Sequence, residues 1–204
     1  MAHIPDGILS APVLIGGAVL AAAGVAWGLR HLDDRSIPRA AILSAAFFAG
    51  SLVAIPAGPS SVHLLLSGLM GIMLGPATFA AVTVALLLQA LLFGFGGLTT
   101  LGVNVFNIAA PGVLLGLLLG PAIRATASVP LRMGLAAATG ALAVLATGGL
   151  VAVALALSSP DYTPVASVLL ATYLPLAIAE AFITAVVVGF LGRVLPGALS
   201  PMAT

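Results

Sequence analysis

The sequence of 204 residues contains no cysteine and no lysine, and charged residues make up only 5% of it. The absence of cysteine excludes disulfide bonds, zinc–thiolate sites, iron–sulfur clusters and a thiol nucleophile. An ordinary soluble domain has about 25% charged residues, so this chain cannot cover a globular surface, which excludes a free soluble enzyme. A net charge of +1 without lysine provides no basic stripe for a nucleic acid. Hydrophobic residues make up 62% of the chain, and this high share predicts an integral membrane protein.

The apolar runs are long and unbroken, which is typical of spanning helices and not of the alternating strands of a membrane barrel. A spanning helix needs about 20 apolar residues, and interruptions by Pro, Gly and Arg divide the chain into segments of about that length. We expect seven spans, near 8–29, 39–57, 62–75, 77–95, 101–123, 131–157 and 165–195. Joining the third and fourth segments across Gly75-Pro76 would give six. The sequence therefore predicts one all-α transmembrane domain over 1–204, with no room for a soluble domain.

The arginines decide between six and seven spans, because positive residues collect on the cytoplasmic side of a membrane. With seven spans and the N-terminus outside, all of them lie in the cytoplasm: Arg30, Arg35, Arg39, Arg124, Arg132 and Arg193. With six spans, the last three would move to the other side from the first three. We therefore expect a multi-pass protein of the inner (plasma) membrane, with its C-terminus in the cytoplasm. Because no positive residue precedes Arg30, we also expect no cleaved signal peptide.

Four polar residues fall inside the predicted spans, where lipid cannot satisfy them and where a functional role is the first hypothesis. They are Gln89, Asn104, Asn107 and Glu180. The two asparagines are three residues apart and share a helix face, and interhelical hydrogen bonds are the favoured interpretation of all three amides. Glu180 is compatible either with a hydrogen-bonded carboxyl that holds helices together or with a proton relay or substrate contact.

Two of the three histidines, His3 and His63, fall on the outer side of the predicted topology, whereas His31 lies in a cytoplasmic loop and is expected to be solvated. Singly, each outer histidine is compatible with a hydrogen-bonded residue at a helix end. Together, in a chain with so few titratable groups, they favour a metal site.

A histidine close to a free terminal amine can chelate a metal through the amine, the backbone amide nitrogen and the ring, all nearly in one plane. Planar nitrogen donors suit Ni²⁺ and Cu²⁺. If Met1 is trimmed, the Ala2 amine with the amide and ring of His3 supplies three donors, and His63 fills the fourth position. If Met1 stays, its amine, the two amides and the His3 ring already fill the plane.

Two further features are noted. Ala41, Ala45 and Ala49 lie four residues apart on one face of the second span, which is compatible with packing inside the protein or with docking of a partner helix. Asp6 lies in a Pro-Asp-Gly turn and is expected to cap a helix that begins near Ile8.

Four motifs carry a resemblance to a known family. They read His-Ile-Pro-Asp-Gly-Ile-Leu-Ser at 3–10, Pro-Ser-Ser-Val-His-Leu-Leu at 59–65, Gly-Val-Asn-Val-Phe-Asn-Ile at 102–108 and Pro-Leu-Ala-Ile-Ala-Glu-Ala at 175–181. In this order they resemble the CbiM/NikM family, the cobalt- and nickel-binding membrane subunits of energy-coupling-factor (ECF) transporters. The resemblance implies the fold of an ECF substrate subunit with an extra N-terminal helix. It also implies a role in metal transport, including supply of cobalt for cobalamin biosynthesis, and no enzymatic activity.

The resemblance further implies a binding site and partners. Residues 1–7 would form a metal-binding loop in which the terminal amine and His3 meet His63, supported by Asn104 and Asn107, with Gln89 and Glu180 also assigned as supporting residues. Family members usually begin Met-His, whereas this chain begins Met-Ala-His, so the donor set depends on trimming of Met1. The implied partners are a membrane coupling subunit that docks on the Ala41, Ala45 and Ala49 stripe, cytoplasmic ATPases and a small accessory membrane subunit. The chain itself would carry no cofactor, only transported Ni²⁺ or Co²⁺.

Two alternatives are weaker. A vitamin-binding ECF subunit needs an aromatic pocket, yet the chain has one Trp and two Tyr. An intramembrane enzyme would need Glu180 at the depth of a histidine, whereas the predicted spans place His63 at a surface end. The choice between nickel and cobalt stays open. Planar nitrogen donation points weakly to nickel, and so does the resemblance of Pro5-Asp6 to the nickel-type members of the family.

Overall fold

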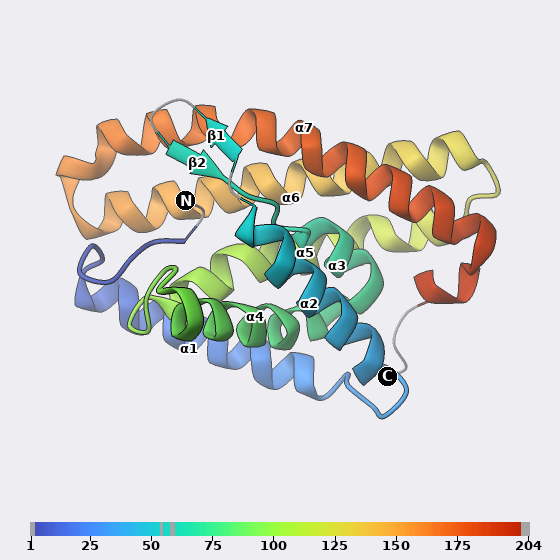
Figure 1. Cartoon of the computed structure of the whole chain (residues 1–204), viewed down its shortest axis with the longest axis horizontal. Coiled ribbons are helices and arrows are strands. Elements are labelled where there is room, and N and C mark those ends of the chain that lie inside the picture. The colour runs from blue at the N-terminus through green and yellow to red at the C-terminus, as the bar shows by residue number, and fades with distance from the viewer. Residues whose placement is uncertain (1–2, 54, 58–59, 201–204) are drawn as a thin grey trace.

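The computed structural model describes residues 3–53, 55–57 and 60–200, and its ordered segments are almost all helical (Figure 1). The α-helices are α1 (Ala11–Leu29), α2 (Ile37–Leu52), α3 (Ser67–Leu74), α4 (Thr78–Phe93), α5 (Leu101–Ala125), α6 (Val129–Ser158) and α7 (Thr163–Val194). Short 3₁₀ turns follow or precede them: η1 (Gly75–Ala77), η2 (Pro160–Tyr162) and η3 (Pro196–Leu199). Two strands, β1 (Ile55–Ala57) and β2 (Ser60–Val62), pair antiparallel between α2 and α3.

Proline and glycine set several helix boundaries. A proline occupies the first turn of α1, α2, α6 and α7, where its missing N–H costs no hydrogen bond. Gly94 ends α4 in the left-handed conformation with φ +66°, and its N–H donates to the carbonyl of Ala90 at 3.2 Å.

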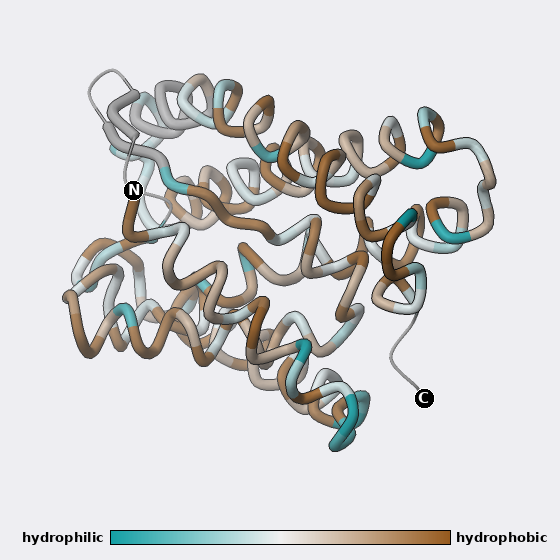
Figure 2. The backbone as a smooth tube through the Cα atoms, turned by 45° about the vertical axis from the view of Figure 1, so that its right-hand side comes forward, coloured by the Kyte–Doolittle hydropathy of each residue, from teal (hydrophilic) through white to brown (hydrophobic). Residues whose placement is uncertain are grey.

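The helices alternate in direction, so that the arginines gather at one end of the bundle, called the arginine end here. Arg39 at the start of α2 donates to the carbonyl of Met73 at the end of α3, at 3.4 Å. Arg132 at the start of α6 donates to the carbonyl of Gly192 at the end of α7, at 3.2 Å. Hydrophilic segments lie in the α1–α2 turn and at the right-hand end of the bundle in Figure 2.

Five described segments are long and apolar enough to cross a membrane, namely α1, α5, α6, Ala171–Val194 of α7 and the continuous stretch Ser67–Phe93. α2 is a shorter apolar helix of 16 residues. The all-helical membrane protein expected from composition is thus confirmed in outline, and the number and orientation of the crossings remain predictions.

The expected spans 39–57 and 62–75 are wrong in extent. α2 ends at Leu52, and the β1–β2 hairpin takes the place of helix on either side of residues 58–59. α3 begins only at Ser67 and has eight residues, too few for the roughly 20 that a crossing needs. The segment between the hairpin and α3 therefore runs as irregular backbone.

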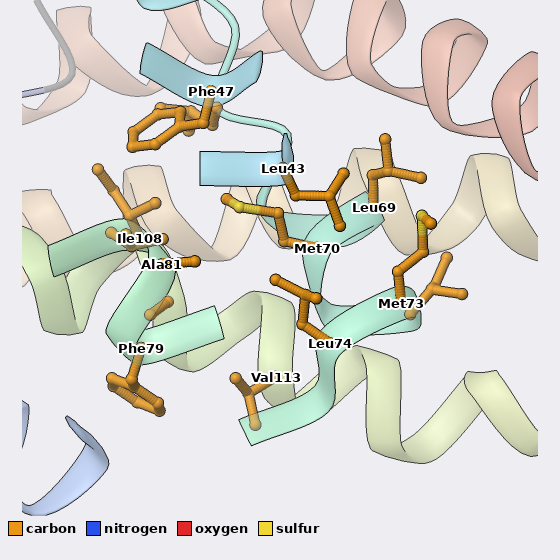
Figure 3. Close-up of a cluster of buried hydrophobic side chains, with 14 of the residues drawn as sticks. Leu43, Phe47, Leu69, Met70, Met73, Leu74, Phe79, Ala81, Ile108 and Val113 are labelled. Atoms are coloured by element: carbon orange, nitrogen blue, oxygen red, sulfur yellow. The ribbon is translucent and has the colours of Figure 1, made fainter. Parts of the chain in front are cut away.

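The short helix α3 lies in the centre of the bundle, and all eight of its residues are buried. Its apolar side chains belong to the main hydrophobic core, the same cluster that contains Leu43 and Phe47 of α2, Phe79 of α4 and Ile108 of α5 (Figure 3). α3 approaches α5 closely because small residues face each other: a Cβ atom at Gly71 would lie 1.8 Å from the carbonyl oxygen of Gly112.

The close approach of α3 and α5 gives a first prediction. Gly71→Ala should lower the free energy of unfolding in detergent by about 1–3 kcal/mol, because the new methyl group meets backbone that cannot move aside. The matched control is Gly134→Ala in α6, where a Cβ atom meets nothing within 4 Å. Thermal unfolding of the purified variants measures both. Equal midpoints for Gly71→Ala and the unsubstituted protein would contradict the packing described here.

Candidate metal-binding site

His3 and His63, sixty residues apart in the chain, lie against each other at the end of the bundle opposite the arginine end. Their ring centroids are 4.7 Å apart and their planes differ by 27°. The exposed fractions of the two residues are only 4% and 5%. Both ring nitrogens of His3 and the Nε2 atom of His63 are buried without a hydrogen-bond partner in the described part of the chain. Such atoms are costly unless something binds them.

The surroundings keep both histidines neutral. Burial, followed by repulsion from the His63 ring, lowers the pKa of His3 to about 3. Burial also lowers the pKa of His63. A neutral imidazole offers a lone pair, which is the form that binds a metal ion. The carbonyl of Leu64 lies 3.1 Å from Nδ1 of His63, so this nitrogen carries the proton and Nε2 is left as the free donor.

The backbone beside His3 is held by α5. Asn104 accepts from the N–H of Ile4 through Oδ1 and donates to the carbonyl of the same residue through Nδ2, both at 3.0 Å. Thr100 donates through its hydroxyl to the Ile4 carbonyl at 2.7 Å. The backbone N–H and C=O groups of buried Ile4 therefore both have partners, and these hydrogen bonds fix the position of the adjoining His3.

Asp6 binds the loop before α5 and not the helix expected to begin near Ile8. Its carboxylate accepts the backbone N–H groups of Leu98, Thr99 and Thr100 at 3.0–3.2 Å. The hydrogen bond from the Thr99 hydroxyl is the main cause of the lowered pKa of Asp6. α1 itself begins at Ala11 without a side-chain cap. The expected local cap is thus wrong, and Asp6 instead ties the N-terminal segment to a loop more than ninety residues away.

The segment that carries His63 is held by α7. Glu180 is fully buried, and its Oε1 atom accepts the N–H of Leu65 and, at 2.8 Å, the N–H of Leu66. Leu66 has a left-handed backbone with φ +50°, the only described residue other than glycine with a positive φ. A carboxylate that binds two successive N–H groups stabilises such a turn. Glu180 therefore lies much nearer to His63 than the predicted spans suggested.

Gln89 of α4 lies beside His3. Its side chain opposes part of the lowering of the His3 pKa, although Oε1 of Gln89 makes no hydrogen bond within the described residues. The amide nitrogen donates to the hydroxyl of Ser51 in α2 at 2.5 Å. Gln89 thus connects the pair of histidines to α2.

The Nδ2 atom of Asn107, unlike that of Asn104, does not bind the N-terminal segment within the described residues. This atom is buried without a partner in the described residues. The side chain lines an apolar groove between α1, α5 and α6, together with Gly16 and Phe106 among others. The supporting role of Asn107 therefore stays a prediction, whereas that of Asn104 has hydrogen bonds behind it.

The remaining predicted positions are as follows. Met1 and Ala2, the predicted source of the terminal amine, lie outside the described residues. His31 is at the arginine end, where Nδ1 donates to the carbonyl of Trp27 at 2.9 Å. Within the described residues, no group of three or more His, Asp or Glu side chains lies close enough to hold a metal ion, so His3 and His63 would need further donors.

Sequence reasoning missed Thr100 and Ser51, which hold Ile4 and Gln89. Neither residue belongs to a motif, and a hydroxyl side chain near a helix end is too common to indicate a functional role. Each contact joins segments 38 or 96 residues apart, so no local signal could have identified it.

Comparison with known proteins gives a consistent result. A family model described as CbiM, cobalt uptake substrate-specific transmembrane region, matches residues 3–198. A protein of Haemophilus influenzae named as a metal transport protein is 36% identical over 95% of both chains. Cobalt transport protein CbiM 1 of Pelobacter propionicus is 36% identical over 94% of this chain and 91% of its own. A protein of Archaeoglobus fulgidus named as a fused nickel transport protein, NikMN, is 36% identical over 56% of this chain and 40% of its own.

Solved structures agree with the sequence relatives. The crystal structure of a transition metal transporter superposes with a TM-score of 0.75 at 28% identity, covering 94% of this chain and 93% of that one. A truncated transition metal transporter gives a TM-score of 0.70 at 25% identity.

The clamp on Ile4 gives the second prediction. Asn104→Ala removes the two hydrogen bonds from Asn104 and leaves the buried N–H of Ile4 unpaired, at about 1–3 kcal/mol, while the Ile4 carbonyl keeps the Thr100 hydroxyl. Amide hydrogen exchange in a peptide covering residues 4–9 should therefore become faster. Asn107→Ala is the matched control, because its Nδ2 atom binds nothing in the described residues. Equal acceleration in the two variants would show that Asn104 has no special role.

Proposed function

Because the chain belongs to the CbiM family of cobalt-uptake membrane subunits, we propose that it captures Ni²⁺ or Co²⁺ at His3 and His63 and passes the ion to an ECF-type importer. The family and its named relatives are transport components and not enzymes. One observation carries the assignment of the site: two buried histidine rings lie against each other, and three of their ring nitrogens have no hydrogen-bond partner among the described residues. A divalent cation is the ligand that neutral imidazoles recruit most readily.

The spacing of the two rings suits a shared metal ion. A metal lies about 2.0–2.1 Å from a coordinating ring nitrogen, so two rings on one ion have centroids at most roughly 6 Å apart. The observed 4.7 Å lies within this reach. The terminal amine and the His3 amide nitrogen would complete a plane of four nitrogens when Met1 is removed. Such a plane serves both ions and favours Ni²⁺ over Co²⁺.

Glu180 and Asn104 act as positioning residues in this proposal. Each binds backbone next to a histidine, and neither touches the ring nitrogens themselves. The segment that carries His3 and the segment that carries His63 are thus each held by a different helix, and neither needs the other to keep its backbone conformation.

The coupling subunit would dock on α2. Ala41, Ala45 and Ala49 are all exposed, and the first two line an apolar groove of about 420 Å³ between α2 and α4. Small residues at this spacing allow a partner helix to approach closely in a membrane. The energy would come from cytoplasmic ATPases, a role consistent with a chain that has no phosphate-binding motif. We place the protein in the plasma membrane, with the histidine end outside and the arginine end in the cytoplasm.

The third prediction concerns the metal site. Purified protein should bind one Ni²⁺ or Co²⁺ per chain, and His63→Ala or an N-terminal extension should each abolish binding. Isothermal titration calorimetry measures the affinity, and mass spectrometry determines the first residue. His31→Ala is the control, since His31 lies at the other end of the bundle. Binding that survives both His3→Ala and a blocked amine would refute the site.

The fourth prediction tests Glu180. Glu180→Ala leaves two N–H groups unpaired and lets the His63 segment shift, so metal affinity should fall at least about tenfold. Glu180→Gln keeps an oxygen that can accept the same two bonds, and affinity should return to within a few fold of the original. A general loss of stability would not be repaired in this selective way. If Glu180→Gln is as defective as Glu180→Ala, positioning is the wrong explanation.

The fifth prediction tests docking. Ala45→Phe should leave metal binding by the purified subunit unchanged and reduce metal uptake by cells about tenfold, because the larger ring keeps the partner helix away. Co-purification with the coupling subunit should be lost as well. Ile178→Phe on α7 is the control, because Ile178, like Ala45, is an exposed apolar residue but lies on a different helix. Normal uptake by Ala45→Phe would exclude this face.

A further inference from the structure

Three arginines from three helices converge on η3 and the residue after it at the arginine end. Arg39 of α2 donates to the carbonyls of Ser200 and Gly197, at 3.1 and 3.5 Å. Arg124 of α5 and Arg132 of α6 line a cavity of about 250 Å³. The other lining residues, none of them acidic, are Gly192, Pro196, Gly197, Leu199 and Ser200.

The two arginines that line the cavity are held differently. Arg132 is fixed by three carbonyls, those of Ile123 at 3.3 Å, Thr126 at 2.6 Å and Gly192 at 3.2 Å. Arg124 makes no hydrogen bond among the described residues. Its guanidinium folds over Gly120, with Nη1 2.8 Å from the position that a Cβ atom there would take. The Arg132 guanidinium is thus held in place, whereas the Arg124 guanidinium donates to none of the described residues.

Among the described residues, no acidic side chain lines the cavity to balance this positive charge. The carboxylate of Asp33, in the α1–α2 turn, accepts the N–H of Ser36 at 2.8 Å within its own turn. Like charges around one cavity repel each other, and an anion between them removes that cost. Guanidinium groups match the oxygens of a phosphate particularly well, because their N–H donors point in a planar fork.

We propose that this cavity binds the phosphate group of an anionic phospholipid from the surrounding leaflet. The cavity lies where α5 and α7 end and α6 begins, which is the level of the lipid headgroups for helices of this length. Basic pockets between helices at this level bind anionic headgroups. A bound headgroup would connect α5 and α6 to η3, adding to the contacts that Arg39 and Arg132 already make. The proposed orientation decides only which leaflet supplies the lipid, so the site can fail independently of metal transport.

The test uses the purified full chain in neutral detergent. Phosphatidylglycerol or phosphatidylcholine is added, and native mass spectrometry counts the lipid that each protein retains. We expect a preference for phosphatidylglycerol that falls roughly fivefold in Arg124→Gln, the effect of removing one arginine near an anionic group. Arg124 is the residue to change, since Arg132→Gln would also break the link between α5 and α7. Arg35→Gln, at an exposed position outside the cavity, should retain the full preference.

Three outcomes would overturn the proposal. The first is equal retention of the two lipids, which would mean that the cavity does not select for charge. The second is an equal loss in Arg35→Gln and Arg124→Gln, which would mean that the whole arginine end attracts lipid without a site. The third is displacement of phosphatidylglycerol by inorganic phosphate at a similar concentration, which would make this a site for free phosphate.

Discussion

A backbone N–H or C=O group inside a bilayer must find its partner within the protein, because lipid offers none. Helices meet this condition by themselves, but the segments that carry His3 and His63 are not helical. In each segment, side chains from a distant part of the chain satisfy the backbone: Asn104 and Thr100 bind Ile4, and Glu180 binds Leu65 and Leu66. The position of both imidazoles, and therefore the whole candidate site, depends on this solution.

The same constraint explains which parts of the fold the sequence could predict. Composition and apolar run length predict membrane helices, and the arginine pattern places His3 and His63 at one end, where their rings indeed meet. The start of α3 could not be found in this way. The apolar run continues through Leu64, Leu65 and Leu66, so hydropathy extends the helix backwards to residue 62. The backbone departs from helix there because Glu180, more than a hundred residues later, binds its N–H groups.

The polar residues show a similar limit. That Gln89, Asn104 and Glu180 matter follows from their occurrence in apolar helices, but spacing alone does not identify their partners. Asn104 and Asn107 share a helix face, yet Asn104 hydrogen-bonds to Ile4 whereas Asn107 lines the apolar groove between α1, α5 and α6. Asp6 has a local helix to cap and binds a distant loop instead. Tertiary contacts decide between such alternatives, and a single sequence contains no record of them.

The long separation between each histidine segment and the residue that holds it has a consequence for biogenesis. The N-terminal segment leaves the ribosome first, but Thr100 and Asn104, which bind Ile4, follow 96 and 100 residues later. Glu180 is synthesised later still, 115 residues after Leu65. Because N-terminal parts emerge first during synthesis, both histidine segments lack their hydrogen-bond partners while the intervening helices insert. If the proposed site is right, the nascent chain would acquire its full affinity for metal only when α7 is in place, so a translation product that stops short of α7 would bind the ion more weakly.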